Sequence, residues 1–158
     1  MRPVVGIIFC AVVCFAKPVP PFRGDLLGGG TLSLKETLSP NKHVLLSFWA
    51  TWCTACIEEL TAVTEKMRSL PNLPLKLVTI NVDLADSASD VRPTMKLYNF
   101  SFPVVLDPQH QIFSKYRNDK SLPYSVLIAP GGDLLRSFQG YSDTLFQEIE
   151  ALIPRKPS

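Results

Sequence analysis

Apolar residues change their spacing along the chain, and each spacing predicts a different element. The run at 43–49 (HVLLSFW) is almost wholly apolar and rich in strand-forming residues, which is typical of a buried central strand. From 54 to 70 the apolar residues recur every three or four positions on one helical stripe, and Glu59 lies outside it. The stripe comprises Cys56, Leu60, Val63, Met67 and Leu70. The pattern therefore predicts a buried strand followed by an amphipathic helix.

Further elements are predicted on both sides of this pair. The expected strands are 31–34, 75–82, 102–106, 124–128 and 134–138, and the expected helices are 87–99, 112–116 and 142–153, the last capped by Ser142. Strands that alternate with helices pair in parallel, whereas a hairpin adds antiparallel strands. We therefore expect an α/β fold with a mixed central sheet and helices on both faces, in one domain over 31–154. Residues 17–30, rich in Pro and Gly, are expected to form an extended segment leading into that domain.

The N-terminal residues 1–16 differ from the rest of the chain. A short basic start precedes an uncharged apolar run that ends at Ala16, and a proline-rich stretch follows. This is the plan of a cleavable secretory signal peptide. A helix of about 13 residues spans only roughly 20 Å, less than the ~30 Å of a hydrocarbon core, so a short retained anchor is the weaker interpretation. A lipid-modified Cys14 is weaker still, because the bulky Val13 precedes it where such processing usually needs a small residue. Cleavage would also remove Cys10 and Cys14, leaving one cysteine pair.

Composition and charge exclude several classes of protein. The 158 residues are 46% hydrophobic and 19% charged, which excludes a disordered chain. With 16 Lys and Arg against 14 Asp and Glu, the formal charge of +2 provides no electrostatic footprint for nucleic acid. His43 and His110 are the only histidines and lie far apart in sequence, so the cysteine pair is not expected to be half of a zinc site and no metal is expected.

Cys53 and Cys56 lie where the predicted strand gives way to the predicted helix. Two cysteines this close gain little stability from a disulfide, because its stabilising effect grows with the length of the loop it closes. At a helix N-terminus, however, free N–H groups and the helix dipole favour a thiolate, which is the attacking species in disulfide exchange. We therefore expect Cys53 to be the nucleophile and Cys56, one turn further along, to be the resolving thiol.

The segment FWATWCTAC at 48–56 resembles the active site of the thioredoxin superfamily, and more narrowly that of the TlpA/ResA-like extracytoplasmic thiol-disulfide oxidoreductases. The segments FPVVLD at 102–107 and SLPYSVLIAPGGDLLRSFQG at 121–140 extend the resemblance to nearly all of the chain after residue 20. It implies a thioredoxin fold with the family's inserted helix. It also implies that the Cys53–Cys56 pair is a redox-active disulfide and that no other cofactor is needed.

The resemblance implies a substrate-binding surface around the cysteines. Pro123 matches the family's cis-proline, and a cis bond there would present the backbone of Leu122 beside the sulfurs for pairing with an extended substrate. An ordinary proline at the start of a strand is the alternative. Trp52, immediately before the nucleophile, is expected to lie over the active-site surface, whereas Trp49 is expected in the core.

The chain departs from the family pattern in its acidic residues. Ser47 stands where thioredoxin has a buried aspartate, so another group must accept the proton of Cys56. The ResA-like members use a carboxylate near the end of the second strand, which makes Asp83 and Asp86 candidates, although either could be a solvated loop residue. Glu59 also matches a family position, and its alternative is a solvated acid that favours the helix dipole.

These features predict an exported thiol-disulfide oxidoreductase, and the resemblance implies that it keeps partner proteins reduced, for example in cytochrome c maturation. The expected partners are protein thiols or disulfides and a membrane-bound or soluble electron donor, in the periplasm or secreted, with membrane attachment only if residues 1–16 are retained. A peroxiredoxin-type peroxidase is an alternative on the same fold, but Ala50 stands where such sites need Ser or Thr. A copper-binding assembly protein is another, but those relatives have a CxxxC motif and a later histidine.

Overall fold

The computed structural model describes residues 17–153, so the signal peptide or anchor predicted for residues 1–16, with Cys10 and Cys14, lies outside the described residues. The strands are β1 (Arg23–Leu26), β2 (Thr31–Ser33), β3 (His43–Trp49), β4 (Leu75–Asn81), β5 (Val104–Leu106), β6 (Tyr124–Ile128) and β7 (Leu134–Gln139). The helices are α1 (Leu34–Thr37), α2 (Thr54–Ser69), the 3-10 helix η1 (Ala85–Asp90), α3 (Val91–Leu97), α4 (Phe113–Tyr116) and α5 (Leu145–Leu152). Within 17–153, no helix combines the length and apolar character that crossing a membrane requires.

The strands form a mixed sheet in the order β2-β1-β5-β4-β3-β6-β7, which confirms the expected α/β architecture. The central strand β3 pairs in parallel with β4 and antiparallel with β6. All seven residues of β3 are buried, as its apolar sequence predicts for a strand covered on both faces. This strand runs directly into the segment that carries the cysteines.

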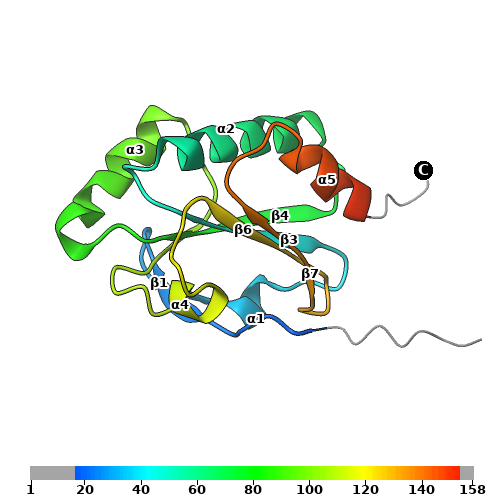
Figure 1. Ribbon diagram of the computed structural model, residues 1–158, viewed down its shortest axis with the longest axis horizontal. Coiled ribbons are helices and arrows are strands. Elements are labelled where there is room, and N and C mark those ends of the chain that lie inside the picture. Colours follow the sequence, from blue (N-terminus) through cyan, green and yellow to red (C-terminus); the bar gives the residue numbers. More distant parts are fainter. Residues whose placement is uncertain (1–16, 154–158) are drawn as a thin grey trace, which may run out of the picture.

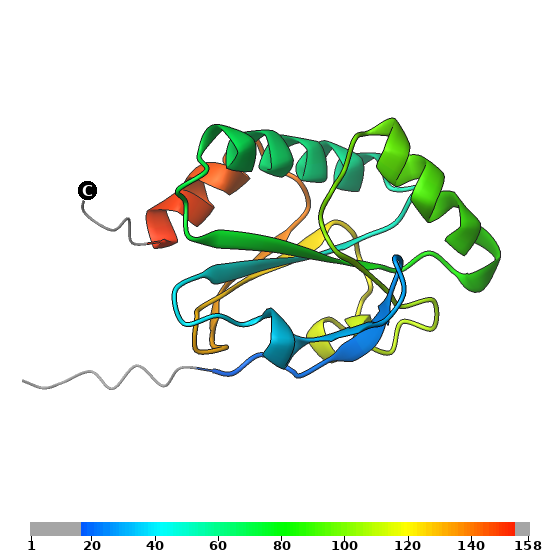
Figure 2. The same cartoon turned by 180° about the vertical axis from the view of Figure 1, so that it is seen from behind.

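Helices cover both faces of the sheet, as expected. Helices α2, α3 and α5 lie over one face and the short helices α1 and α4 over the other (Figures 1 and 2). Successive residues of β3 point to opposite faces. Phe48 stacks on Phe113 of α4, with 4.7 Å between ring centroids, whereas Trp49 meets Phe102 edge-on at 6.5 Å. The apolar cores on both sides thus hold the end of β3 rigidly.

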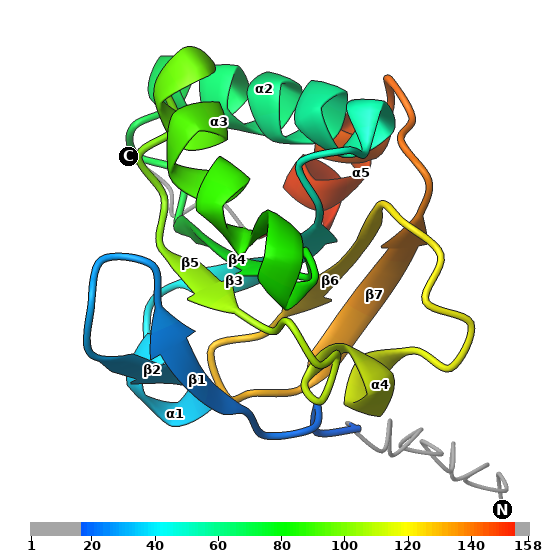
Figure 3. The same cartoon turned by 90° about the vertical axis from the view of Figure 1, so that its left-hand side faces the viewer.

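The segment 17–30 is not a simple extended lead-in, because β1 within it belongs to the sheet. β1 pairs antiparallel with β2 and with β5, so it lies second from one edge of the sheet, with β2 outside it (Figure 3). Gly24 makes this pairing close, since a Cβ atom there would lie 2.5 Å from Cγ1 of Val105. The expected domain boundary at residue 31 is therefore too late, because the turn residues around β1 mask a short strand.

Two predicted helices differ from the structure at their starts. The final helix begins at Leu145 rather than at Ser142, and the Ser142 hydroxyl accepts a hydrogen bond from the Thr144 N–H before the helix starts. The helix expected over 87–99 is split into η1 and α3, with Pro93 in the first turn of α3, where its missing N–H costs nothing. These two elements form the insertion between β4 and β5.

Candidate active site

The site is built where β3 passes into α2. A tight turn follows β3, in which the Cys53 N–H donates to the carbonyl of Ala50 at 3.1 Å. Cys53 is the N-cap of α2, and its sulfur forms a disulfide with Cys56, with 5.2 Å between the two Cα atoms. The strand-to-helix position predicted from the sequence is confirmed, and the two cysteines are close enough to exchange electrons as a pair.

The two sulfurs occupy different environments. Cys53 is 8% exposed and Cys56 is 1% exposed, and the Cys56 N–H donates to the Cys53 Sγ at 3.2 Å. The same N–H also donates to the Cys53 carbonyl at 3.1 Å, and it lies at the start of α2, where the helix dipole would stabilise a Cys53 thiolate in the reduced protein. Of the two cysteine residues, Cys53 is therefore the more exposed.

Glu59 is buried on α2, one turn after Cys56. Its side chain is 1% exposed, which contradicts both its expected place outside the buried stripe and the alternative of a solvated first-turn acid. One carboxyl oxygen, Oε1, accepts hydrogen bonds from Ser47 at 3.1 Å and from Ser125 at 2.5 Å. The other, Oε2, is buried without a hydrogen-bond partner in the described part of the chain. Burial raises the pKa of Glu59 above its ordinary value.

The serines explain how a carboxylate fits in this core. Ser47 comes from β3 and Ser125 from β6, two strands that pair at these residues. Ser47 stands where thioredoxin has a buried aspartate, and its hydroxyl instead donates a hydrogen bond to the buried Glu59. Ser125 was not predicted as a site residue, and its only sequence signal is a hydroxyl within an otherwise apolar buried strand.

Asp83 and Asp86 lie in different surroundings. Asp83 is 1% exposed, so it is not a solvated loop residue, and its two carboxyl oxygens accept hydrogen bonds from Thr51 and Asn81. Asp86 is exposed in η1. Neither contact of Asp83 is with a cysteine, and the sequence did not indicate Thr51 or Asn81 as its partners.

The residues expected to form a substrate surface come from two segments, the turn before Cys53 and the segment that enters β6. Trp52 is 69% exposed, whereas Trp49 is fully buried, as predicted. The Leu122–Pro123 peptide bond is cis, and Pro123 immediately precedes β6. Because Phe48 pairs with Tyr124, this proline comes next to the end of β3 in the antiparallel register. The Pro123 carbonyl also accepts from the Gly140 N–H, which ties the loop after β7 to the same edge.

A groove of about 650 Å³ runs over the exposed face of α2 next to the turn that carries Cys53. Thr54, the residue after Cys53, lines it, and Tyr141 lines it from the loop after β7. Burial and the neighbouring Asp143 raise the pKa of Tyr141. The sequence analysis did not indicate this groove, because its walls come from segments far apart in the chain.

Comparisons with known proteins agree with this geometry. The model of the AhpC/TSA family matches residues 15–143. The chain is 33% identical over 99 residues to the thiol-disulfide oxidoreductase ResA of Bacillus subtilis and 30% identical over 124 residues to that of Bacillus thuringiensis. These alignments cover 63% and 78% of this chain but 54% and 69% of the relatives, so the chain spans only part of their length. A crystal structure from Chlorobium tepidum, described as a thiol:disulfide interchange protein DsbE, superposes with a TM-score of 0.74 at 23% identity, over 88% of this chain and 97% of that one, which shows the shared fold.

Glu59→Gln is expected to remove a pH-dependent loss of stability. Burial raises the folded-state pKa of Glu59 above 4.5, so its contribution to the free energy of unfolding is complete below that pH and falls as the pH rises toward the folded-state pKa. The neutral glutamine cannot ionise. In urea denaturation of the oxidised proteins, the wild type should therefore lose stability relative to the variant as the pH rises above 4.5, by at most about 1.4 kcal/mol per pH unit.

The control is Glu65→Gln, an exposed glutamate on the same helix, which should leave the difference from wild type independent of pH. If the curves for Glu59→Gln and wild type run parallel over the whole range, the pKa of Glu59 is not raised.

Proposed function

The chain belongs to the AhpC/TSA family, and we propose that it is an exported enzyme that reduces disulfides of partner proteins through Cys53 and Cys56. The relatives that carry this proposal are named thiol-disulfide oxidoreductases. The observation that carries the proposal is a disulfide at the start of α2 in which the Cys53 residue is more exposed than the Cys56 residue. Ala50 offers no hydroxyl to hold a peroxide, so nothing at the site favours the peroxidase alternative.

Reduction proceeds by two thiol-disulfide exchanges. The Cys53 thiolate attacks one sulfur of the substrate disulfide, so that a mixed disulfide forms and the other substrate sulfur leaves as a thiolate and takes a proton. The Cys56 thiol then loses its proton and attacks the Cys53 sulfur. This releases the second substrate thiol and forms the Cys53–Cys56 disulfide seen in the structure. Two electrons pass to the substrate, and a thiol donor must return them before the next turnover.

Glu59 is the proton acceptor for Cys56 in this scheme. It is three residues after Cys56 on α2, on the same side of the helix, and its Oε2 has no partner among the described residues. A raised pKa makes a carboxyl group a better base for a thiol at neutral pH. Asp83 is less suited, because both its oxygens already accept hydrogen bonds, and Asp86 is exposed on η1.

Trp52, Leu122 and Pro123 form the surface that receives the substrate. The exposed indole of Trp52 supplies apolar contact area beside Cys53. The backbone of Leu122, ahead of the cis bond, pairs with an extended substrate segment as an added strand. The groove along α2 accommodates the chain beyond the reacting sulfur. Proteins with exposed disulfides in flexible segments, including haem-binding CxxCH sites, are the proposed substrates.

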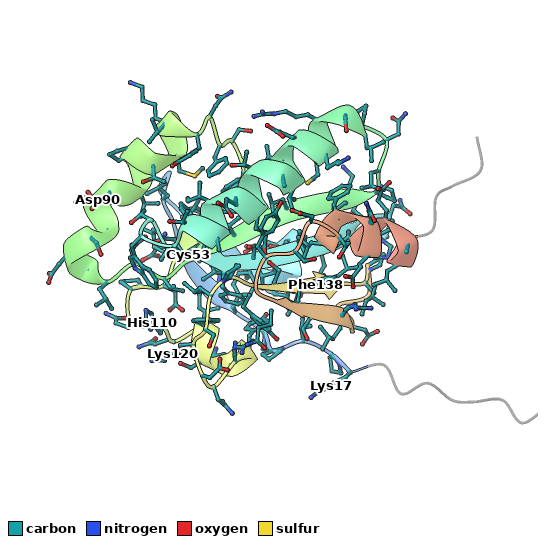
Figure 4. The ribbon with its side chains drawn as sticks, turned by 45° about the horizontal axis from the view of Figure 1, so that its top comes forward. Lys17, Cys53, Asp90, His110, Lys120 and Phe138 are labelled. Carbon is teal, nitrogen blue, oxygen red and sulfur yellow. A yellow bond between two sulfur atoms is a disulfide. The ribbon has the colours of Figure 1, made fainter. Side chains whose placement is uncertain are left out.

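Export is supported by the signal-like pattern of residues 1–16 and by the single remaining cysteine pair. Lys17, the first described residue, lies at the lower rim of the molecule in Figure 4, well away from Cys53. A retained N-terminal segment would therefore leave the active site free to face its partners. The proposed location is the periplasm or the outer face of the membrane, with a membrane-bound or soluble electron donor.

Cys56→Ala should trap substrates as mixed disulfides on Cys53, because the first exchange can still occur but no thiol is available to resolve it. Cys53→Ala should trap little, since Cys56 is only 1% exposed. Reduced variants are incubated with a disulfide-containing protein such as insulin, and the adducts are counted by non-reducing electrophoresis and mass spectrometry. Equal trapping by both variants would contradict the assigned roles.

Glu59→Gln should slow the second exchange and leave the first largely unchanged. Loss of a general base typically costs about 10² in rate or more, so decay of the mixed disulfide should slow by about 100-fold at neutral pH. Stopped-flow measurements with a fluorescent disulfide peptide separate formation of the mixed disulfide, which serves as the internal control, from its decay. Decay at the wild-type rate would assign the proton of Cys56 to another acceptor.

The direction of electron transfer is tested by the reduction potential. A reductant of partner proteins should equilibrate with glutathione buffers at a potential below about −230 mV, in the range of thioredoxin. The fraction of Cys53–Cys56 disulfide is measured by alkylation of the free thiols. A value near about −120 mV would mark an oxidant and contradict the reducing direction while leaving disulfide exchange intact.

A further inference from the structure

Asp83 makes an unusually complete set of contacts for a buried carboxylate. Its Oδ2 accepts from the Thr51 backbone N–H at 2.9 Å and from the Asn81 side-chain amide at 2.7 Å, and its Oδ1 accepts from the Thr51 hydroxyl at 2.8 Å. Its own N–H donates to Oδ1 of Asn81 at 3.2 Å. Every contact of the carboxylate is with a donor, as an acceptor-only group requires. Two of these three donors belong to Thr51.

Thr51 lies in the turn that carries the nucleophile. The turn is closed by the hydrogen bond from the Cys53 N–H to the Ala50 carbonyl, so Thr51 is its second residue and Trp52 its third. This segment lies between β3 and α2, so the hydrogen bonds within those two elements do not hold it in place. The contact with Asp83 therefore joins the turn to the end of the neighbouring strand β4.

A second hydrogen bond supports the same junction. The Val82 N–H donates to the Trp49 carbonyl at 2.9 Å, which extends the pairing of β3 and β4 by one step beyond the strands. Asp83 comes next and reaches Thr51 across the same gap. The segments that leave β3 and β4 thus stay together at the end of the sheet where α2 and η1 begin (Figure 3).

We propose that Asp83 is a positioning residue that holds the Cys53 sulfur at the N-terminus of α2 by fixing the Thr51 turn. The geometry matters because the Cys56 N–H reaches the Cys53 Sγ at 3.2 Å, and a small shift of the turn would lengthen this contact. The stabilisation of a thiolate by helix N-terminal donors falls off within the first turn. Asp83 thereby sets how much of Cys53 is thiolate and how fast it attacks.

This role predicts different effects for two substitutions of Asp83. Asparagine has the same shape as aspartate. Its side-chain oxygen can accept the hydrogen bond from the Thr51 N–H, and its NH₂ group can donate to the Thr51 hydroxyl once that hydroxyl has rotated. Asp83→Asn should therefore keep the turn in place. Asp83→Ala removes all three hydrogen bonds of the carboxylate, so the Thr51 turn should shift relative to α2. A purely electrostatic role would give the opposite pattern, since loss of a nearby negative charge in either variant would lower the pKa of Cys53.

The experiment measures the pKa of Cys53, from the pH dependence of alkylation by iodoacetamide, and its rate constant with oxidised glutathione. All variants are made in the Cys56→Ala background, so that Cys53 alone reacts. Asp83→Ala should raise the pKa of Cys53 and slow its reaction by about tenfold, whereas Asp83→Asn should stay within about threefold of the parent, because displacements of about 1 Å at a reacting group cost up to 10² in rate. Asp90→Asn, an exposed aspartate on η1, is the charge-matched control and should change neither value.

Thr51→Val provides a second route if Asp83→Ala does not fold. It deletes only the hydroxyl donor to Asp83 and should change both quantities in the same direction as Asp83→Ala, by a smaller factor. The inference is overturned if Asp83→Asn is as impaired as Asp83→Ala, if the pKa of Cys53 falls in both, or if Thr51→Val and Asp83→Ala leave both quantities unchanged. It rests on the proposed exchange at Cys53. A parent protein that does not react with oxidised glutathione contradicts that function, whereas a reactive parent with unaltered variants contradicts this inference alone.

Discussion

The parallel pairing of β3 with β4 is the contact on which the rest of the site depends. It joins seven consecutive residue pairs, from His43–Leu75 to Trp49–Asn81. Because the strands run in the same direction, their carboxyl ends leave the sheet at one edge, where antiparallel β6 begins. That edge therefore receives the cysteines, Asp83 and the Leu122–Pro123 bond from three separate parts of the chain. A register shift of one residue would turn Ser47 to the other face and leave Glu59 without one of its two donors.

Two buried carboxylates at this edge differ because their surroundings differ. Asp83 has donors on both oxygens, so its environment suits a fixed acceptor that holds backbone in place. Glu59 has donors on one oxygen and none among the described residues on the other, and burial raises its pKa. An incompletely satisfied carboxyl group gains more from taking up a proton, because the neutral form needs fewer partners. The same chemical group thus serves structure in one place and suits the proposed proton transfer in the other.

The sequence predicted those parts of the molecule that depend on local pattern. The apolar run of β3, the amphipathic stripe of α2 and the spacing of Cys53 and Cys56 each lie within one segment, and each corresponds to what the structure shows. The burial of Glu59 could not be predicted in this way. Its position lies beside the apolar stripe of α2, and only the two hydroxyls on the facing strands make its burial tolerable. The partners of Asp83 and the strand β1 were missed because both depend on which segments the sheet brings together.

Cys53 combines the capping of a helix with the proposed role of nucleophile. The N-cap position favours Ser, Thr, Asp or Asn, whose oxygen accepts a hydrogen bond from the first turn and contributes about 1 kcal/mol. Here the sulfur is the acceptor, and the donor is the backbone of its own redox partner, Cys56. A thiolate accepts such a bond more strongly than a disulfide sulfur does, so the cap is strongest when Cys53 is ready to attack. Attack on a substrate weakens that bond while Cys56 remains one turn away. The helix end therefore favours the thiolate form of Cys53. In the Cys53–Cys56 disulfide the same N–H still donates to the Cys53 sulfur, at 3.2 Å, but that sulfur carries no charge.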